Sequence, residues 1–474
     1  MLLSYSAASP SRTISGTGHQ LPLPPSPKGW PIIGNALDMP LEKMAQGYAK
    51  WGRDLNSDIV SASAMGKVVI VLNSIDKALD LLDKRSTKYS SRLGFDYFFV
   101  MLPYGDRWKE RRRMFVQHFR PADTSIVYPQ VREFVQRFLG AGYLPGKMEA
   151  FTISLAYGFS IKPRGDPHLE FAEATVKMLA EILTPGANFI DALPILKHLP
   201  AWLPGASSNR KAKELSYMSE KCRSAPFDEA VSKFFRRNND EAAAYQKQVI
   251  KDTAAMFYMA GTDTIVGSIL NWVWAMLKNP EVQARVHAEL DEVLKGRMPD
   301  FEDQEKLPYL MASLMESTRW VGFTPSTLPG VPHMNTEDDV YDDYLIPKGS
   351  IVIANLWAML RNEEDYANGE TYDPSRFLTP DGKIDPGVRD PFTVAFGFGR
   401  RACPGAHIGR SMFCLVAASL ATLFKWTEPL GEDGKPIDQP MDYETGMVYQ
   451  PKPFRCGFKV RSPEAQALFA NMEG

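Results

Sequence analysis

The residues from 396 to 409 constrain this chain more than any other stretch, because they place one cysteine in a glycine-rich loop directly before a helix. Gly397, Gly399 and Gly405 permit positive φ and a close approach of the backbone. Apolar residues then recur with helical spacing, and a helix N-terminus favours a thiolate. The loop can therefore hold Cys403 beneath a large flat group. The simpler interpretation is a small buried hydrophobe, and a phosphate-binding loop is rejected because Gly-Lys-Ser/Thr is absent.

This stretch resembles the cysteine-ligand loop of the cytochromes P-450, whose pattern is Phe-x-x-Gly-x-Arg-x-Cys-x-Gly. The fixed positions are filled by Phe396, Gly399, Arg401, Cys403 and Gly405. The resemblance implies that Cys403 is the axial ligand of the iron of heme b. It also implies that Arg401 pairs with a heme propionate and that Phe396 shields the proximal side. A thiolate ligand pushes electron density toward iron and favours O–O cleavage.

Composition limits the remaining choices. The chain has 474 residues, 44% of them hydrophobic, so it can bury a large core. A formal net charge of −2 gives no reason to expect a nucleic-acid partner. Its four cysteines are scattered, which excludes a disulfide framework or a Cys-x-x-Cys metal site and fits a reducing compartment.

The N-terminal region divides into two parts. Residues 1–20 contain no apolar run long enough to span a bilayer, so we expect a segment without a membrane anchor. Residues 21–34 are rich in proline and predict a semi-rigid extended hinge, with a ligand for an SH3-type partner as the alternative. We expect residues 21–474 to form a single catalytic domain.

Periodicity predicts a mainly α protein with a small β-rich lobe. We expect helices at 41–51, 75–84, 108–119, 246–277 and 307–320, and strands at 67–72, 340–346 and 351–355. The resemblance to the cytochromes P-450 implies that these elements form a triangular helical prism that encloses heme.

A basic helix opens at Trp108. A run of charges is usually a solvated helix face, but Trp108 and Arg112 are one turn apart on one face. They resemble the family's Trp-x-x-x-Arg motif, which implies contact with a heme propionate through a charge-assisted bond. Lys109, Arg111 and Arg113 would then present positive charge to an acidic electron donor.

Small residues interrupt the long helix at 246–277. Phe257, Ala260, Gly261 and Thr264 share one helical face, which on its own indicates packing more often than chemistry. The run Ala-Gly-Thr-Asp-Thr resembles the family's oxygen-binding motif. That resemblance implies that Asp263 and Thr264 deliver protons and that Ala260 and Gly261 leave room for dioxygen and substrate. We assign Phe257 to the substrate pocket.

Other motifs complete the resemblance. Glu316 and Arg319 form a Glu-x-x-Arg pair that alone would be an ordinary surface pair. With Arg376 downstream it resembles the family's buried Glu/Arg/Arg network, which implies a role in folding and heme retention. By the same resemblance His333 is a heme contact and Val448 lies in a loop that lines the substrate pocket.

Residues 189–203 are apolar and interrupted by prolines. They predict either ordinary core or a peripheral membrane contact beside an entry channel, because Trp and Leu favour the lipid interface. We hold the two interpretations equal. The resemblance to microsomal members implies the cytosolic face of the endoplasmic reticulum membrane, with peripheral or soluble states left open by the missing anchor helix.

The expected function is that of a heme-thiolate monooxygenase resembling fungal enzymes of secondary metabolism. It would insert one atom of dioxygen into an apolar small molecule such as a terpenoid or polyketide. Its electrons would come from NADPH through a separate reductase, because no flavin or nicotinamide domain is evident in this sequence. The alternatives are a heme-thiolate isomerase or dehydratase that uses no dioxygen, and an inactive heme-binding relative with shortened segments.

Overall fold

The computed structural model describes residues 11–13, 20–40, 43–64, 66–92, 99–119, single positions between 167 and 178, 207–234, 241–321, 329–431, 434–437, 439, 442–443 and 451–473. Residues 1–10, 189–203 and Val448 are outside these ranges, so the predictions for the N-terminal segment, the apolar segment and the last substrate loop concern residues that are not described here.

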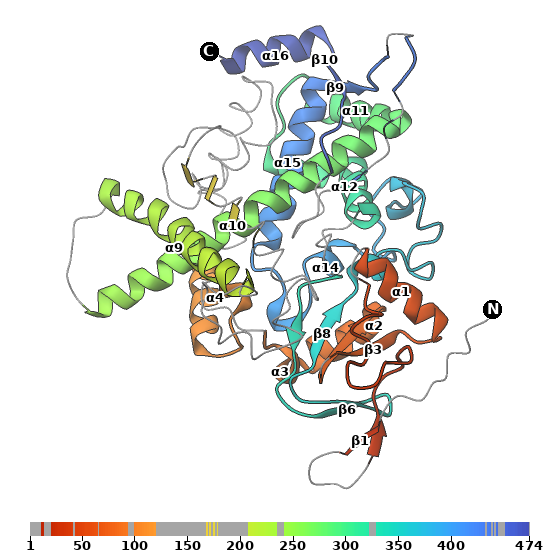
Figure 1. Cartoon of the computed structure of the whole chain (residues 1–474). Coiled ribbons are helices and arrows are strands. Elements are labelled where there is room, and N and C mark those ends of the chain that lie inside the picture. The colour runs from red at the N-terminus through yellow and green to blue at the C-terminus, as the bar shows by residue number, and fades with distance from the viewer. Residues whose placement is uncertain are drawn as a thin grey trace.

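Helices dominate the described chain (Figure 1). The α-helices are α1 (Met44–Asp54), α2 (Ile75–Ala78), α3 (Ser86–Tyr89), α4 (Asp106–His118), α9 (Ser207–Phe234), α10 (Glu241–Lys278), α11 (Pro280–Leu294), α12 (Pro308–Val321), α13 (Leu356–Met359), α14 (Phe392–Ala395), α15 (Ala406–Leu423) and α16 (Pro463–Glu473). The π- and 3-10 turns are η1 (Leu79–Lys84), η2 (Phe99–Met101), η4 (Phe301–Lys306), η5 (Pro374–Phe377) and η6 (Gly399–Arg401).

The strands are short. They are β1 (Ser11–Thr13), β2 (Gln20–Pro22), β3 (Ile59–Ala64), β4 (Lys67–Leu72), β5 (His333–Met334), β6 (Asp339–Tyr341), β7 (Tyr344–Ile346), β8 (Ile351–Ala354), β9 (Phe424–Thr427) and β10 (Gly457–Val460). Most of them lie in a lobe apart from the long helices, whereas β9 and β10 pair beside α15 and α16 at the other end of the molecule (Figure 1). This architecture, mainly helical with a small sheet lobe, confirms the predicted fold class.

The main sheet has the order β3-β4-β8-β5 and joins distant parts of the chain. β4 pairs with β8 in parallel, with Val69 opposite Ile351, and this pairing requires the long crossover that contains most of the helices. β5 pairs with β8 and places His333 opposite Val352. An isolated bridge between Ser91 and Met334 then brings His333 next to the N-terminal third of the chain.

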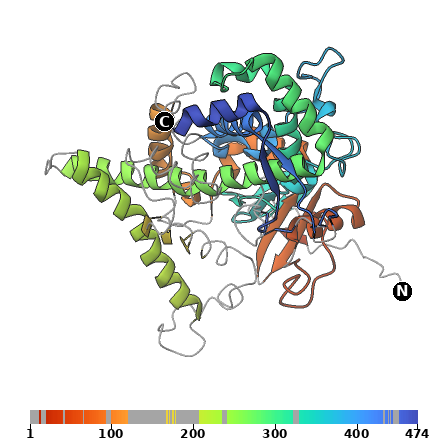
Figure 2. The ribbon, with the colours of Figure 1, turned by 90° about the horizontal axis from the view of Figure 1, so that it is seen from above.

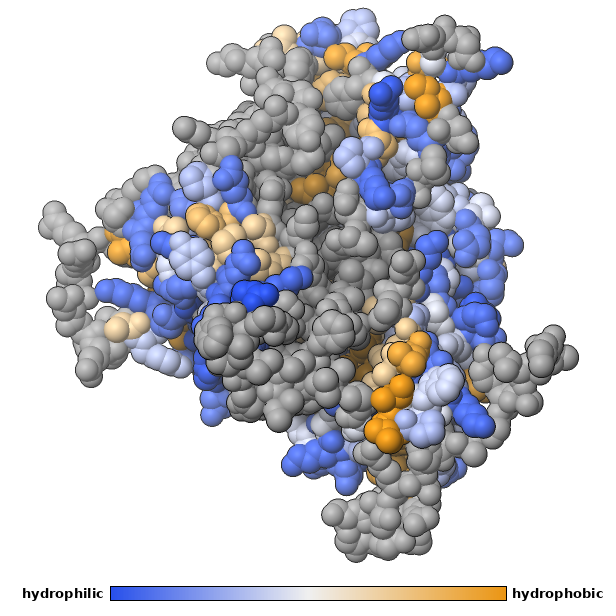
Figure 3. All heavy atoms as spheres, in the orientation of Figure 1, coloured by the Kyte–Doolittle hydropathy of each residue, from blue (hydrophilic) through white to orange (hydrophobic). Residues whose placement is uncertain are grey.

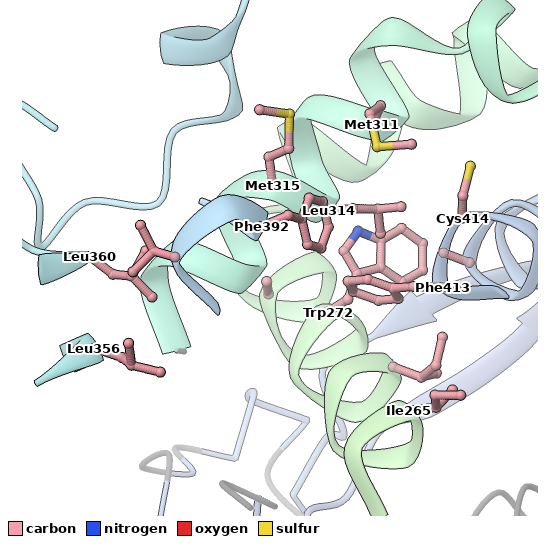
Figure 4. Packing of buried hydrophobic residues seen from close by; sticks show 14 of the residues in the cluster. Ile265, Trp272, Met311, Leu314, Met315, Leu356, Leu360, Phe392, Phe413 and Cys414 are labelled. Carbon is pink, nitrogen blue, oxygen red and sulfur yellow. The ribbon is translucent and has the colours of Figure 1, made fainter. Parts of the chain in front are cut away.

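Helix α10 is the central element (Figure 1), and from above it runs across the whole helical part of the molecule (Figure 2). Its C-terminal half packs against α12 and α15 around Trp272, which is fully buried (Figure 4). The Trp272 indole N–H donates to Ser313 Oγ at 3.0 Å, and its ring meets Trp426 edge-on at 5.4 Å. Truncating such a residue to alanine typically costs about 3–5 kcal/mol. This core fixes α10 against α15, the helix that follows the cysteine loop.

The segment predicted as one strand at 340–346 is instead a hairpin. β6 and β7 are antiparallel, and the turn residues Asp342 and Asp343 have φ of 49° and 62°. Two successive residues with positive φ suit a two-residue hairpin turn whose twist matches that of the strands. The prediction of a single strand was wrong because the turn uses Asp-Asp rather than a glycine signal.

The proline-rich residues 21–34 pack against β3. Ser61 N–H donates to the Pro25 carbonyl at 2.8 Å, Asn35 Nδ2 donates to the Pro27 carbonyl at 2.9 Å, and Leu23 is buried. Hydrophilic residues cover much of the described surface on one face of the molecule (Figure 3). Within the described ranges, one helix, α15, is long and apolar enough to cross a membrane, and 72% of it is buried inside the protein.

Candidate heme site

The cysteine loop is held by its own backbone. Cys403 N–H donates to the Phe396 carbonyl at 2.8 Å, which closes the loop, and α15 starts three residues after the cysteine. Gly399 has φ of 56°, and a Cβ on it would lie 2.2 Å from the Leu82 carbonyl oxygen. Glycine is therefore required at this position, both by conformation and by the close approach of η1.

The Cys403 thiol occupies a recess. It is the exposed one of the four cysteines, yet surrounding protein desolvates the thiol and raises its pKa. The exposure of Cys403 and the desolvation of its thiol are compatible, because solvent reaches one side of the residue while protein atoms surround the rest. The Gly405 N–H and the Arg112 guanidinium act in the opposite direction and lower the pKa of the thiol. A bound cation such as iron would outweigh the desolvation and favour the thiolate.

The protein side of the loop is aromatic and tightly packed. A Cβ on Gly405 would lie 4.0 Å from Cys403 Sγ and 3.6 Å from the Phe115 ring. Phe396 is partly buried and stacks on Phe392 with 5.8 Å between ring centres. The loop therefore packs against aromatic rings behind the sulfur.

Arg401 is buried without an acidic partner among the described residues. Its Nε and Nη2 donate to the carbonyls of Ser90 and Leu102, each at 2.6 Å. Its guanidinium also lies 4.3 Å from the centre of the Trp108 ring. Desolvation and the nearby Arg112 lower the pKa of Arg401 to about 10. The repulsion between these two cations favours binding of an anion beside them.

Arg112 and Trp108 connect α4 to the cysteine loop. Arg112 Nη1 donates to the Ala402 carbonyl at 2.7 Å, and its guanidinium lies 5.5 Å from the centre of the Trp108 ring. Trp108 itself is buried. The ring therefore contacts two guanidiniums, those of Arg112 and Arg401, and holds both on the same side of the cysteine.

Arg92 belongs to the same group of cations and was not found from the sequence. It is buried and donates to the carbonyls of Val331 and Pro332, while its Nε has no hydrogen-bond partner in the described part of the chain. Desolvation and then Arg401 lower the pKa of Arg92 to about 9. Only the unusual pattern of a lone arginine after two serines could have pointed to it, because its neighbours come from distant segments.

His333 lies next to Arg92. The imidazole is buried, and its Nδ1 is 2.9 Å from the Tyr89 carbonyl, so Nδ1 carries the proton and donates. Burial first, and then the charge of Arg92, hold the pKa of His333 well below its usual value. We call Arg92, Arg112, Arg401 and His333 the cation cluster. No carboxylate of the described residues pairs with its three arginines.

The cation cluster fits the propionates of heme. A carboxylate pair would satisfy the buried Arg92 Nε and offset the repulsion among the guanidiniums, since arginine binds carboxylates through short charge-assisted bonds. The described residues contain no group of three or more His, Cys, Asp or Glu side chains that could hold a metal ion by themselves. A prosthetic group that brings its own ligands to iron, with Cys403 as the protein ligand, agrees with both observations.

The small-residue face of α10 is open in the middle of the helix. Ala260 is exposed and Gly261 is partly exposed, although Tyr258, Met259 and Ile265 on the same helix are buried. An exposed alanine in the centre of a core helix indicates free space beside it. Thr264 Oγ1 donates to the Ala260 carbonyl at 2.8 Å, so its proton is held on this face. The side chain of Asp263 is outside the described part of the structure.

Phe257 takes part in a stack of three rings. Its ring is nearly parallel to that of Phe119, at 4.7 Å and 10°, and lies 5.6 Å from that of Phe115. Phe115 in turn contacts the position of Gly405. This packing links α10 and α4 on the side of the cysteine loop, and a role for Phe257 in substrate binding stays a prediction.

The three members of the Glu/Arg/Arg motif meet. Arg319 Nε and Nη2 donate to the two oxygens of Glu316 at 2.7 and 2.8 Å, and Arg376 Nε donates to Glu316 Oε1 at 3.2 Å. Glu316 and Arg319 are fully buried. The interpretation of this pair as an ordinary surface pair is therefore excluded by its position.

Arg111 is not part of a basic docking face. We expected it to present charge beside Lys109 and Arg113, but it is buried and pairs with Asp252 of α10. Lys109 and Arg113 are exposed. The prediction failed for Arg111 because helical position alone did not show that α10 covers that side of α4.

A mainly helical fold, a recessed cysteine and buried arginines without a carboxylate partner among the described residues together fit the class of proteins that bind heme through a thiolate. Comparison with known proteins agrees. The family model for "Cytochrome P450" matches residues 148–458. "Cytochrome P450 monooxygenase ple1" of Rhodocybe pseudopiperita is 39% identical, over 94% of this chain and 91% of that protein. "Tryptamine 4-monooxygenase" of Psilocybe cyanescens is 36% identical, over 93% and 94%.

A third relative, "Cytochrome P450 monooxygenase claR" of Ampulloclitocybe clavipes, is 33% identical over 94% of this chain and 88% of that protein. The chain therefore belongs to the cytochrome P450 family. It is similar to fungal monooxygenases along most of its length, and it is an enzyme of the heme monooxygenase kind.

Proposed function

We propose that this enzyme inserts one oxygen atom of dioxygen into a C–H bond of an apolar secondary metabolite, with electrons from NADPH through a separate reductase. The observation that carries the proposal is the recessed Cys403 thiol beside cations that have no acidic partner among the described residues. That arrangement suits a flat dianionic group whose metal binds sulfur. Fungal monooxygenases among the relatives support the same reaction type.

Each residue of the site has a defined task in this proposal. Cys403 would be the protein ligand to the heme iron, and Arg92, Arg112, Arg401 and His333 would hold the propionate carboxylates. Trp108 keeps two of the guanidiniums aligned. When bound, heme supplies the redox chemistry of dioxygen activation, which no amino-acid side chain provides.

The open face of α10 binds substrate and manages protons. Ala260 and Gly261 leave space because neither carries a long side chain. Thr264 Oγ1 lies 2.8 Å from the Ala260 carbonyl oxygen, to which it donates, and its hydroxyl can exchange that acceptor for a group in the adjacent space. Asp263 directly precedes Thr264 in the sequence, and we assign it to proton supply by its place in the motif.

The substrate class is proposed as apolar, such as a terpenoid or polyketide. One relative is described as acting on tryptamine, so an aromatic amine is the comparison to include. Phe257 and Val448 are proposed to affect substrate binding. The attachment of the enzyme to the cytosolic face of the endoplasmic reticulum is proposed from the family alone, and fractionation of cells that express the tagged chain would test it.

The test is reconstitution with a fungal P450 reductase, NADPH, ¹⁸O₂ and a panel of terpenoid, polyketide and indole-amine compounds. We expect product that contains one ¹⁸O atom and depends on NADPH. Product without NADPH would instead favour the isomerase or dehydratase alternative. Thr264→Ala should lower product formed per NADPH consumed. Thr253→Ala is the matched control, because Thr253 also donates to a carbonyl one turn earlier on α10, at 2.7 Å, but is buried.

A further inference from the structure

Asp252 joins three helices through one buried carboxylate. Its Oδ2 accepts from Arg111 of α4, at 2.9 Å from Nε and 2.6 Å from Nη2. Its Oδ1 accepts from Arg223 of α9 at 2.8 Å and from Gln248 of α10 at 2.7 Å. Asp252 and Arg111 are both buried. Each carboxylate oxygen thus has two donors, and the side chain has a single well-defined position.

The place of Asp252 follows from the way α9 and α10 cross. Helices α9 and α10 lie at an angle to each other (Figure 2), and the bond from Arg223 to Asp252 joins them. Arg223 is eleven residues before the end of α9, and Asp252 is eleven residues after the start of α10. Each residue is therefore about 16 Å along its own helix from that end, and α4 contacts α10 there through Arg111.

Helix α4 connects this ion pair to the cysteine loop. Neighbouring residues on a helix differ by about 100° in direction, so Arg111 and Arg112 face different elements. Arg111 binds Asp252, whereas Arg112 donates to the Ala402 carbonyl, one residue before Cys403. Trp108, one turn earlier, contacts the guanidiniums of Arg112 and Arg401. The orientation of α4 about its axis therefore determines where Arg112 and Trp108 lie.

We propose that Asp252 is a positioning residue that fixes α4 through Arg111 and so holds Arg112 and Trp108 against the cysteine loop. The inference rests on the proposed heme-thiolate function and adds a residue to it. The two bonds from one guanidinium to one carboxylate oxygen set direction as well as distance, which a lysine in place of Arg111 cannot do. A positive charge near the sulfur favours the reduced, more negative state of a bound heme.

Two variants test this in the heme-loaded full chain. Asp252→Asn removes the charge with little change in shape, and Arg111→Lys keeps the charge but loses the fork. Tyr245→Phe is the control, because the Tyr245 hydroxyl also joins α10 to α4, through Glu110 at 2.7 Å, but at an exposed position. The measurements are the reduction potential of the heme iron, the absorption of the reduced carbon monoxide complex, and thermal unfolding.

We expect Asp252→Asn and Arg111→Lys to shift the potential to more negative values. We also expect a several-fold larger fraction of the carbon monoxide complex without the thiolate band, whereas Tyr245→Phe matches the wild type. If Arg111→Lys unfolds at a lower temperature but keeps the wild-type potential and spectrum, Asp252 only stabilises the fold and the inference is overturned. If the wild type itself lacks the thiolate band, the proposed function fails first.

Discussion

Two groups of buried arginines in this protein differ in what neutralises them. In the Glu/Arg/Arg network, Arg319 and Arg376 share the carboxylate of Glu316, and Arg319 also donates to the carbonyls of Leu360 and Gly369. In the cation cluster, Arg92 and Arg401 have only carbonyl partners among the described residues. Among the described residues, the first group has its own carboxylate and the second has none.

The difference teaches how to separate residues that hold the fold from residues that hold a ligand. Removing the partner of a paired buried charge strongly destabilises the folded protein. An unpaired buried cation already costs free energy in the protein without a ligand and regains it when an anion binds. Depressed arginine pKa values of about 9 and about 10 at Arg92 and Arg401 are the sign of that cost.

The largest expected effect is at the complete network. Glu316→Gln leaves the buried Arg319 and the partly buried Arg376 without this carboxylate, and we expect a loss of about 3–5 kcal/mol in the free energy of unfolding. The loss should be the same with and without heme, measured by urea denaturation. Glu364→Gln, an exposed glutamate, is the control and should change stability by less than about 0.5 kcal/mol. A loss seen only in the heme-loaded protein would contradict the comparison.

Arg401→Gln should behave in the opposite way. Removing one charged partner of a propionate should weaken heme binding by roughly 10- to 100-fold, about 1.5–3 kcal/mol, measured by transfer of heme to apomyoglobin. The free energy of unfolding of the heme-free protein should stay constant or rise, because an unpaired buried charge is gone. Arg400→Gln, at the exposed neighbouring position, is the control. Equal destabilisation of the heme-free protein would place Arg401 with the structural arginines.

His333 gives the comparison a pH dependence. Its pKa in the folded protein is well below the ordinary 6.5 because of burial and the charge of Arg92. Below pH 6.5 the unfolded chain therefore binds a proton that the folded protein does not. Stability should be fully present above pH 6.5 and fall by about 1.4 kcal/mol per pH unit below it, down to the folded pKa.

Heme-free protein is the material for this measurement, with His333→Gln as the reference. The pKa values of His287 and His407 are also depressed by burial, so only the difference between wild type and His333→Gln isolates His333. Propionate carboxylates would raise the pKa of His333, so the difference should shrink in the heme-loaded protein. An equal difference in both forms would argue against a carboxylate beside His333.

The smallest expected effect is at the exposed basic residues of α4. Lys109→Ala and Arg113→Ala should each raise the reductase concentration needed for half-maximal turnover by a few-fold, since rim charges mainly affect association. The effect should disappear in about 0.5 M salt, because salt at that concentration screens interactions between exposed charges. No change at low salt would remove α4 from the docking surface for the reductase.

The sequence predicted local elements better than it predicted partners. The strand at 67–72 has the predicted bounds because Val and Ile fill it, and the long helix extends only slightly beyond 246–277. β3 was missed because four of its six residues, two serines and two alanines, carry no strand signal. Arg111 and Asp252 are 141 positions apart, so no local pattern could pair them. The same reason hid Arg92 from the candidate site.

The most direct measurement is the absorption spectrum of the dithionite-reduced protein with carbon monoxide, recorded for the wild type and Cys403→Ser after both are supplied with heme. The account predicts the strongly red-shifted Soret band of a thiolate-ligated heme in the wild type and its absence in Cys403→Ser. A wild type without that band, or a band that persists in Cys403→Ser, would contradict Cys403 as the heme ligand.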